Sequence, residues 1–334
     1  MFSFARPGPP RVRPRLPFWP ARRRGSVAPM RRALLLLVAL WSGPASAETL
    51  RVGPGQRFER PSQAAAVARA GDTVRIAAGR YTDCAIWRAP GLRIMADGGP
   101  VEITGPVCGS KALFVTAAPR IEIVGITFRG ATAPAGNGAG IRAEGGDLTI
   151  RASRFEENEN GILSAPTPGA TILVEDSTFL RNGALRDGRE CAHGIYIGAA
   201  GALLIRRSRF EATRVCHHVK SRAARTEILD SQILDGPDGR ASFLVDIPNG
   251  GELLLRGNTL RKGPNSGNPG TAIALGFEGA RIDTPRLRIL DNRFENVMPR
   301  GTTFVANRTA TPAELVGNRL TGRVEPLAGP GTVR

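Results

Sequence analysis

Side chains that transfer protons gather in one stretch of this 334-residue chain. Imidazole, phenol and amine groups can remove or donate a proton near neutral pH, and a guanidinium binds carboxylates. Such a set predicts removal of a proton next to a carboxylate, with a cation that stabilises the enolate formed. The stretch contains all three histidines of the chain, one of its two tyrosines, a lysine and an arginine: His193, Tyr196, His217, His218, Lys220 and Arg222.

Four of these residues are predicted to be catalytic. Lys220 is the predicted base, Arg222 or a histidine, His218, stabilises the enolate, and Tyr196 is the acid or is itself the base. Abstraction of the proton beside a uronate carboxylate begins both β-elimination and C5-epimerisation. The predicted enzyme is therefore a lyase or an epimerase, and the sequence does not separate the two.

Four other interpretations concern the same residues. Glycoside hydrolysis needs two carboxylates at a defined separation, and only Asp246 is predicted to face this surface. Zinc is disfavoured because His217 and His218 are adjacent on a strand and point to opposite faces. Calcium at Asp246 with loop carbonyl oxygens stays open. A structural role also stays open, with Lys220 and Asp246 as a surface ion pair worth under about 1 kcal/mol.

The elements that must position these residues repeat along the chain. In each copy an aliphatic residue precedes a Ser or Asn by three positions, and an apolar residue follows it by two. Alternating aliphatic residues indicate a strand with one buried face, and the spacing between copies suits three short strands and their turns. The copies, of which the first lacks the polar residue, are 121–128, 148–155, 172–179, 203–210, 226–233, 253–260, 287–294 and 313–320.

A second strand precedes each copy and sets a register. If one aliphatic residue of each such strand points inward, the next residue points outward, and outward residues on successive rungs are about 4.8 Å apart. The same alternation places His218 and Arg222 outward on either side of Lys220. A slip of one residue would bury the whole column. The predicted outward column is Arg142, Leu163, Tyr196, Lys220, Asp246, Ala274 and Ala306.

The polar residues of the copies fall where the strand must turn, a position that favours side chains bonding to their own backbone. With the alternating strands, this column resembles the asparagine ladder of the pectate-lyase-like, right-handed parallel β-helix superfamily, over about residues 50–325. The resemblance implies that the strand carrying Lys220 lines a substrate groove, and that a lyase of this kind would use a Lys or Arg base with bound calcium. The column consists of Ser153, Ser177, Ser208, Ser231, Asn258, Asn292 and Asn318.

The predicted fold is all-β, a single right-handed parallel β-helix. Its handedness follows from the resemblance and from the right-handed bias of parallel crossovers. The segment 71–81 resembles the entrance to this fold. A short helix within 61–70 is expected to cap the open N-terminal end of the core, because solenoid ends need covers.

The N-terminal residues are interpreted as an address rather than as structure. Residues 30–47 have the charged start, apolar run and small-residue cleavage site of a signal peptide, so we expect export to the periplasm or outside the cell. Residues 1–29 form a basic Arg- and Pro-rich extension, and Met30 is an alternative start. The β-helix domain is then 48–334, with no transmembrane segment after removal of the signal.

Charge and cysteines refine this interpretation. Nine arginines precede residue 48, so the formal net charge of +17 falls to +8 (17 − 9) and nucleic acid is not an expected partner. An exported protein favours disulfides, and four cysteines allow three pairings. The register puts Cys191 and Cys216 on adjacent rungs, which leaves Cys84 to pair with Cys108.

The predicted function is therefore that of an exported, monomeric protein that acts on an acidic, uronate-containing polysaccharide. The alternative is a non-catalytic glycan-binding or cell-envelope structural β-helix that uses the same groove. Besides the catalytic residues, side chains of the outward column and its flanks are expected to bind substrate: His193, His217, Asp246, Arg142 and Asn249.

Overall fold

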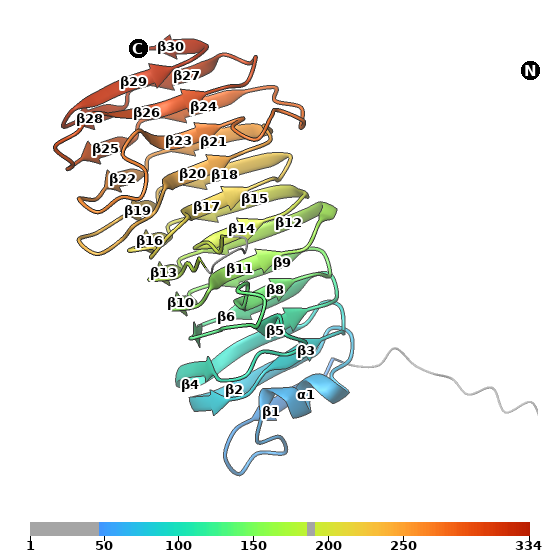
Figure 1. Cartoon of the computed structure of the whole chain (residues 1–334). Helices are drawn as coiled ribbons and strands as arrows, with labels where there is room; N and C mark the ends of the chain where they lie inside the picture. The colour runs from blue at the N-terminus through green and yellow to red at the C-terminus, as the bar shows by residue number, and fades with distance from the viewer. Residues whose placement is uncertain (1–46, 186–190) are drawn as a thin grey trace, which may run out of the picture. The chain divides into compact units, whose positions relative to one another are not determined.

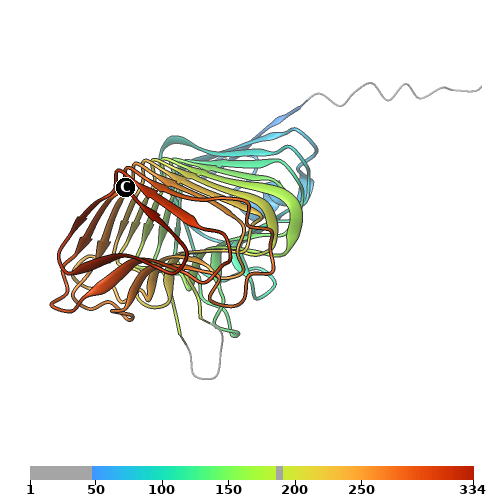
Figure 2. The same ribbon diagram turned by 90° about the horizontal axis from the view of Figure 1, so that it is seen from above.

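A computed structural model describes residues 47–185 and 191–334. Within these residues, parallel strands stack rung upon rung from β1 to β30 (Figure 1). Along the stacking axis the rungs overlie one another (Figure 2). Each complete rung contributes one strand to a ten-stranded sheet and two to a twenty-stranded sheet. The prediction of a parallel β-helix with three strands per rung is confirmed.

The ten-stranded sheet carries the predicted site, and we call it the groove sheet. Every neighbouring pair of its strands is parallel. Its strands are β3 (Ala85–Trp87), β5 (Ala112–Thr116), β8 (Ala139–Ala143), β11 (Asn160–Ser164), β14 (Ile195–Ile197), β17 (His217–Ser221), β20 (Phe243–Ile247), β23 (Thr271–Leu275), β26 (Thr302–Asn307) and β29 (Val324–Ala328).

The twenty-stranded sheet, called the long sheet here, forms the other two walls. The two walls join into one sheet because β2 (Thr73–Thr82) and β4 (Arg93–Thr104) run through the corner between them. The first wall also contains β1 (Thr49–Val52), β6 (Ile121–Val124), β9 (Leu148–Arg151), β12 (Thr167–Glu175), β15 (Ala200–Arg206), β18 (Arg225–Leu229), β21 (Glu252–Arg256), β24 (Leu287–Leu290), β27 (Ala313–Val316) and β30 (Gly331–Val333). The second contains β7 (Ile126–Arg129), β10 (Arg154–Glu156), β13 (Thr178–Leu180), β16 (Arg209–Glu211), β19 (Gln232–Leu234), β22 (Thr259–Lys262), β25 (Arg293–Asn296) and β28 (Arg319–Thr321).

The predicted polar column forms the corner between the two walls of the long sheet. The backbone N–H of Ser231 donates to Asn258 Oδ1 at 2.9 Å, and the N–H of Asn258 donates to Asn292 Oδ1 at 3.0 Å. The serines Ser177 and Ser208 repeat the pattern with a 3.1 Å bond. The residues just before this column take positive φ, which turns the chain and leaves the N–H groups for the ladder to satisfy.

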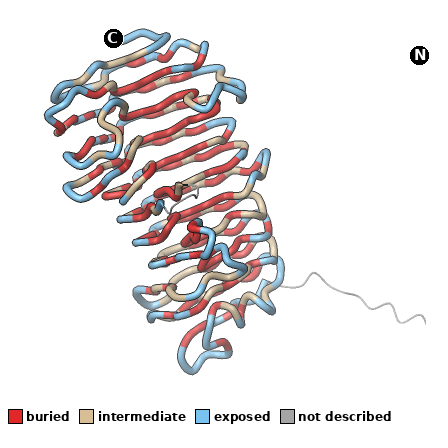
Figure 3. Tube along the Cα trace, viewed as in Figure 1, coloured by how far each residue is buried: buried red, intermediate tan, exposed pale blue. Residues whose placement is uncertain are grey.

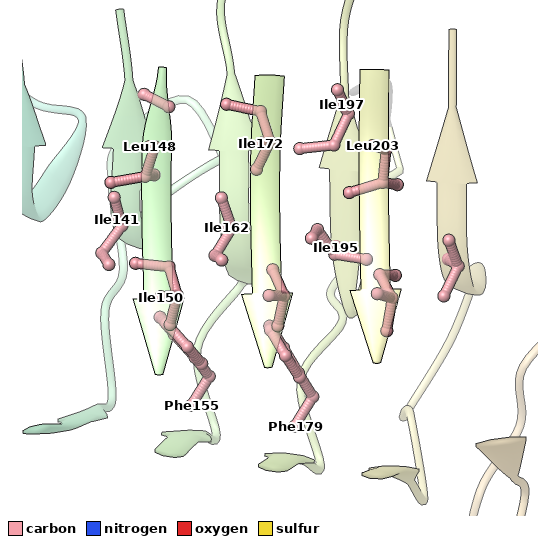
Figure 4. Close-up of a cluster of buried hydrophobic side chains, with 14 of the residues drawn as sticks. Ile141, Leu148, Ile150, Phe155, Ile162, Ile172, Phe179, Ile195, Ile197 and Leu203 are labelled. Carbon is pink, nitrogen blue, oxygen red and sulfur yellow. The ribbon is translucent and has the colours of Figure 1, made fainter. Parts of the chain in front are cut away.

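The core lies between the sheets, where the strands are buried and the turns exposed (Figure 3). Aliphatic residues of the groove sheet face those of the long sheet, as Ile162 and Ile172 do in Figure 4. Phenylalanines of the second wall stack on successive rungs, with 4.6 Å between the ring centroids of Phe155 and Phe179. Burial of such apolar area drives the stacking of rungs.

Helix α1 (Pro61–Val67) packs against β1 and β3 near the start of the domain, as predicted for a cap. Proline at its first position suits a helix start, and the Gln63 side chain accepts hydrogen bonds from the N–H groups of Glu59 and Arg60. The helix ends before the predicted limit because Ala68 takes an extended conformation.

The predicted N-terminal extension (1–29) and signal peptide (30–47), apart from Ala47, lie outside the described residues. Throughout residues 47–185 and 191–334, the helical structure is too short to traverse a lipid bilayer.

Candidate functional site

Three adjacent strands of the groove sheet bring the central predicted residues together. Tyr196 on β14 aligns with Lys220 on β17, and Lys220 aligns with Asp246 on β20. Their inward neighbours are fully buried in the core: Ile195, Val219 and Val245. The structure thus has the predicted register, with this column on the outer side of the sheet.

Lys220 lies between two carboxylates. Its Nζ is 3.3 Å from Asp246 Oδ2 and donates to Glu278 Oε1 at 2.7 Å. Glu278 comes from the turn after β23 rather than from the strand column. Lys220 therefore forms ion pairs with two carboxylates, as a carboxylate-binding group does.

Arg222 uses each of its guanidinium nitrogens. Nε donates to the Tyr196 hydroxyl oxygen at 2.9 Å, Nη2 donates to Glu278 Oε2 at 2.6 Å, and Nη1 donates to Asn249 Oδ1. Hydrogen bonds to Glu278 and Tyr196 raise the pKa of Arg222 although burial opposes them. The planar guanidinium of Arg222 therefore links the Tyr196 phenol to the Glu278 carboxylate and orients both groups.

Asp246 is almost completely buried beside Lys220, and burial raises its pKa to about 6 although Lys220 acts in the opposite direction. His217 Nε2 lies 3.5 Å from Asp246 Oδ2, while His217 Nδ1 accepts the N–H of Phe243 at 3.2 Å. The neutral imidazole thus carries its proton on Nε2, facing Asp246. Burial, followed by the charges of Lys220 and Lys262, lowers the pKa of His217 to about 3.

His193 lies beneath Tyr196. Its ring stacks on that of His217 at 4.9 Å and meets the ring of Tyr196 edge-on at 5.3 Å. Burial and the positive charges around it hold its pKa well below 6.5, so the ring is neutral. His193 and His217 therefore support the column from below, and His217 holds Asp246.

The prediction that His218 is a catalytic residue on the groove face is wrong. His218 is completely buried, with Nδ1 at 2.8 Å from Thr213 Oγ1 and Nε2 at 3.0 Å from Asp235 Oδ1. The aligned residues of the next two rungs, Leu244 and Ala272, are also completely buried, so on this sheet the outward alternation begins only after the inward aliphatic residue, here Val219. The equivalent position on an earlier rung is Gly161, where an added Cβ would meet the buried ring of Phe179.

Two neighbouring cavities open on the groove sheet. The smaller, of about 250 Å³, is lined by His193, Tyr196, Lys220, Arg222, Glu278 and Cys191. The larger, of about 670 Å³, shares Tyr196, Arg222 and Cys191 and extends to Arg142, Leu163 and Asn160. Tyr196 and Arg222 stand at the border, so a chain-like ligand lying along the sheet would cross them.

The remaining predicted residues differ in their relation to this border. Arg142 lines the larger cavity, with Nε 3.3 Å from Glu144 Oε1. Asn249 is buried behind Arg222, accepts its hydrogen bond, and donates to the carbonyl oxygen of Gly279 at 3.2 Å. Asn249 therefore positions Arg222 and the turn of Glu278.

Sequence reasoning missed Glu278. It lies 58 residues after Lys220 in a turn between β23 and β24, and the repeat does not encode the path of that turn. The signal available was a lone acid between the glycines Gly276 and Gly279, one rung beyond Asp246. Burial raises the pKa of Glu278, but the hydrogen bonds from Lys220 and Arg222 outweigh it and lower the net pKa.

The residues around Asp246 do not fit calcium. Among the described residues, no three His, Cys, Asp or Glu side chains are grouped to hold a metal ion. Oδ2 of Asp246 faces an ammonium and an imidazole, and Oδ1 is buried without a hydrogen-bond partner. Calcium takes six to eight oxygen ligands, whereas this carboxylate offers one and has a cation beside it.

Two disulfides join adjacent rungs with the predicted pairing. Cys84–Cys108 has a Cα separation of 5.5 Å and Cys191–Cys216 one of 5.9 Å. Cys191 lines both cavities, so the second disulfide fixes one wall of the site. Residues 186–190 of the loop before it lie outside the described part of the chain.

Comparison with known proteins gives similarity at the level of solved structures. No protein-family model matches the sequence, and no curated protein matches it. The A-module of a mannuronan C-5 epimerase from Azotobacter vinelandii is similar at a TM-score of 0.40 and 15% identity, over 82% of this chain and 92% of that one. A PL6-family alginate lyase is similar at a TM-score of 0.41 and 15% identity, over 86% of this chain and 40% of that one.

Proposed function

We propose that this protein is an exported enzyme that removes the C5 proton of a uronate residue in an acidic polysaccharide. One observation carries the proposal. Lys220 and Arg222 together bind the carboxylate of Glu278, and Arg222 also donates a hydrogen bond to the Tyr196 hydroxyl. A uronate carboxylate bound by these two cations would lie on one side of the Arg222 guanidinium, and the Tyr196 hydroxyl would lie beside another nitrogen of the same group. That is the pairing that proton abstraction beside a carboxylate requires.

Tyr196 is the proton-transferring group in this proposal. Its oxygen, as phenolate, takes the C5 proton while the electron pair moves toward the substrate carboxyl carbon, and Lys220 and Arg222 stabilise the resulting enolate dianion. In elimination the C4–O bond then breaks, a C4–C5 double bond forms, and the tyrosine proton passes to the leaving oxygen. Epimerisation starts with the same step and ends when water on the other face of the ring gives a proton to C5, while Tyr196 releases its proton to solvent.

Lys220 changes its predicted role in this arrangement. The sequence made it the base, but its Nζ forms ion pairs with two carboxylates within 3.3 Å, which suits a group that binds a carboxylate. An ammonium in this place binds the substrate carboxylate and offsets the charge of the enolate. Asp246 and the neutral His217 hold the ammonium from the side away from the cavity.

Export is the other part of the proposal. The signal-like pattern of residues 30–47 supports it, and two disulfides are typical of an oxidising compartment such as the periplasm or the cell exterior. Acidic polysaccharides occur there, and the groove-sheet cavities lie on the surface of the domain.

The test is incubation of the mature protein with a panel of polyuronates, with ultraviolet absorbance reporting the unsaturated product of elimination and loss of the C5–H proton signal in deuterated water reporting epimerisation. We expect Tyr196→Phe to lower turnover by roughly 10²- to 10⁴-fold, the usual contribution of a general acid or base. Tyr81→Phe is the matched control, because the chain's other tyrosine is buried far along the helix and donates to the Ala77 carbonyl oxygen. Undiminished turnover in Tyr196→Phe would rule out this chemistry, and binding without turnover would favour a glycan-binding protein.

A further inference from the structure

Glu278 bridges the two cations of the site with one carboxylate. Oε1 accepts from Lys220 Nζ at 2.7 Å and Oε2 accepts from Arg222 Nη2 at 2.6 Å. Lys220 lies on β17 and Arg222 directly follows the end of that strand, so their head groups form a clamp that one carboxylate fills. Glu278 fills the clamp in the way a uronate carboxylate would.

The two acids beside Lys220 differ in how they are held. Asp246 extends from β20 in the sheet itself, and its side chain is 3% exposed. Glu278 reaches in from a turn outside the sheet, and its side chain is 45% exposed. A half-exposed ion pair is weak, because water competes for both partners. Glu278 is therefore the acid that can leave, whereas Asp246 is part of the site.

The turn that carries Glu278 is anchored without its side chain. The N–H of Glu278 donates to the Pro248 carbonyl oxygen at 2.9 Å, and Gly279 N–H closes the turn on Gly276 at 3.1 Å. The ring of Phe277 meets that of Phe243 edge-on at 5.7 Å. Rotation of the Glu278 side chain alone would empty the clamp, since the backbone keeps its bonds.

We propose that Glu278 is a built-in competitor that occupies the carboxylate subsite and must swing out before a uronate residue binds. This inference rests on the proposed function for the identity of the ligand. The exchange keeps the charge of the clamp constant, because one carboxylate replaces another. It also selects the ligand: a neutral sugar or an esterified uronate brings no charge to displace Glu278.

The test compares binding of uronate tetrasaccharides in the Tyr196→Phe background, where turnover does not consume the ligand. Oligoglucuronate, oligogalacturonate and oligomannuronate are titrated by calorimetry, with maltotetraose as the uncharged control. We expect Glu278→Gln to bind at least one uronate roughly threefold to tenfold more tightly, the effect of removing a weak competing ion pair. Glu295→Gln is the matched control and should change nothing, because Glu295 is 51% exposed and pairs with Arg261 on the long sheet.

Each outcome decides the inference. Equal or weaker binding by Glu278→Gln, or no uronate binding at all, overturns it. Tighter binding upholds it even if no polyuronate is turned over, in which case the proposed chemistry fails and the inference stands. Turnover by the protein with Tyr196 intact, together with unchanged affinity in Glu278→Gln, would uphold the proposed chemistry and overturn the competitor role of Glu278. If the Gln variant does not fold, Glu278→Asp replaces it. This variant keeps the charge but shortens the side chain, and should still bind the uronate more tightly than the protein with Glu278.

Discussion

Burial shifts the pKa values of several side chains around Lys220, and so decides which of them are charged. Asp246 is held in a buried place next to a cation, and its pKa of about 6 means that its charge is largely lost between pH 7 and pH 5. His217 stays neutral in that range because burial lowers its pKa to about 3, and burial also lowers the pKa of His193 well below 6.5. Glu278 stays charged, since its pKa is below the usual value. Asp246 is thus the group of this cluster that titrates near neutral pH.

This assignment predicts how the affinity for uronates depends on pH. A uronate in the clamp is repelled by ionised Asp246, so the affinity should rise about two- to tenfold as pH falls from 7 to 5. Asp246→Asn should bind tightly at pH 7 and show no further rise, as calorimetric titrations at both pH values would reveal. A rise of the same size in the Asn variant would assign the titration to another group.

Part of the site could be predicted from the strand pattern of the sequence, and part could not. Tyr196, Lys220 and Asp246 could be predicted as neighbours because the aliphatic residues before them alternate cleanly. His218 could not, because the residue before the inward aliphatic is itself buried on this rung and on the next two, against strict alternation. Glu278 could not either, because the turns of a solenoid vary between rungs without altering the strand pattern.

At the scale of elements, the polar ladder holds the corner of the long sheet. Asn258 accepts the N–H of Ser231, and its side-chain nitrogen donates to the Ile228 carbonyl oxygen at 2.8 Å and to Asn292. The sequence predicted this column because Ser and Asn recur at one fixed place in each copy. The strand boundaries around it depend on the turns, so they could be placed only approximately.

Asn258→Ala should therefore destabilise the fold. It leaves buried backbone groups on adjacent rungs without partners, which costs about 2–4 kcal/mol in the free energy of unfolding. Asn265→Ala is the matched control, because Asn265 is exposed and bonds to the Pro237 carbonyl oxygen; its effect should stay within about 0.5 kcal/mol. Urea unfolding of both variants measures the difference, and equal stabilities would show that the ladder does not stabilise the corner.

At the scale of the whole molecule, the fold carries buried groups whose protonation links stability to pH. His193 and His217 are neutral when folded and take up protons near pH 6.5 when unfolded, so the stability they allow is present above pH 6.5 and lost below it. Asp246 acts in the opposite direction, because its folded pKa exceeds its unfolded value and stability is gained as pH falls through 6.

The histidines outweigh the aspartate in this balance. By pH 5 His217 costs about 2 kcal/mol, His193 acts in the same direction, and Asp246 returns about 1 kcal/mol, so the free energy of unfolding should fall between pH 7 and pH 5. The His193→Gln/His217→Gln double variant should lose most of this fall. Urea unfolding at the two pH values tests it, and an unchanged pH dependence in the double variant would refute the linkage.

In the proposed reaction, Tyr196 removes the C5 proton of a uronate held by Lys220 and Arg222. Proton NMR of the polyuronate panel, incubated with the protein in deuterated water, tests it most directly because elimination and epimerisation both remove the C5–H signal. We predict that the signal of one polyuronate disappears with the unaltered protein and persists with Tyr196→Phe. Persistence of the C5–H signal in every polymer, with uronate oligosaccharides still bound in the groove, would contradict the account.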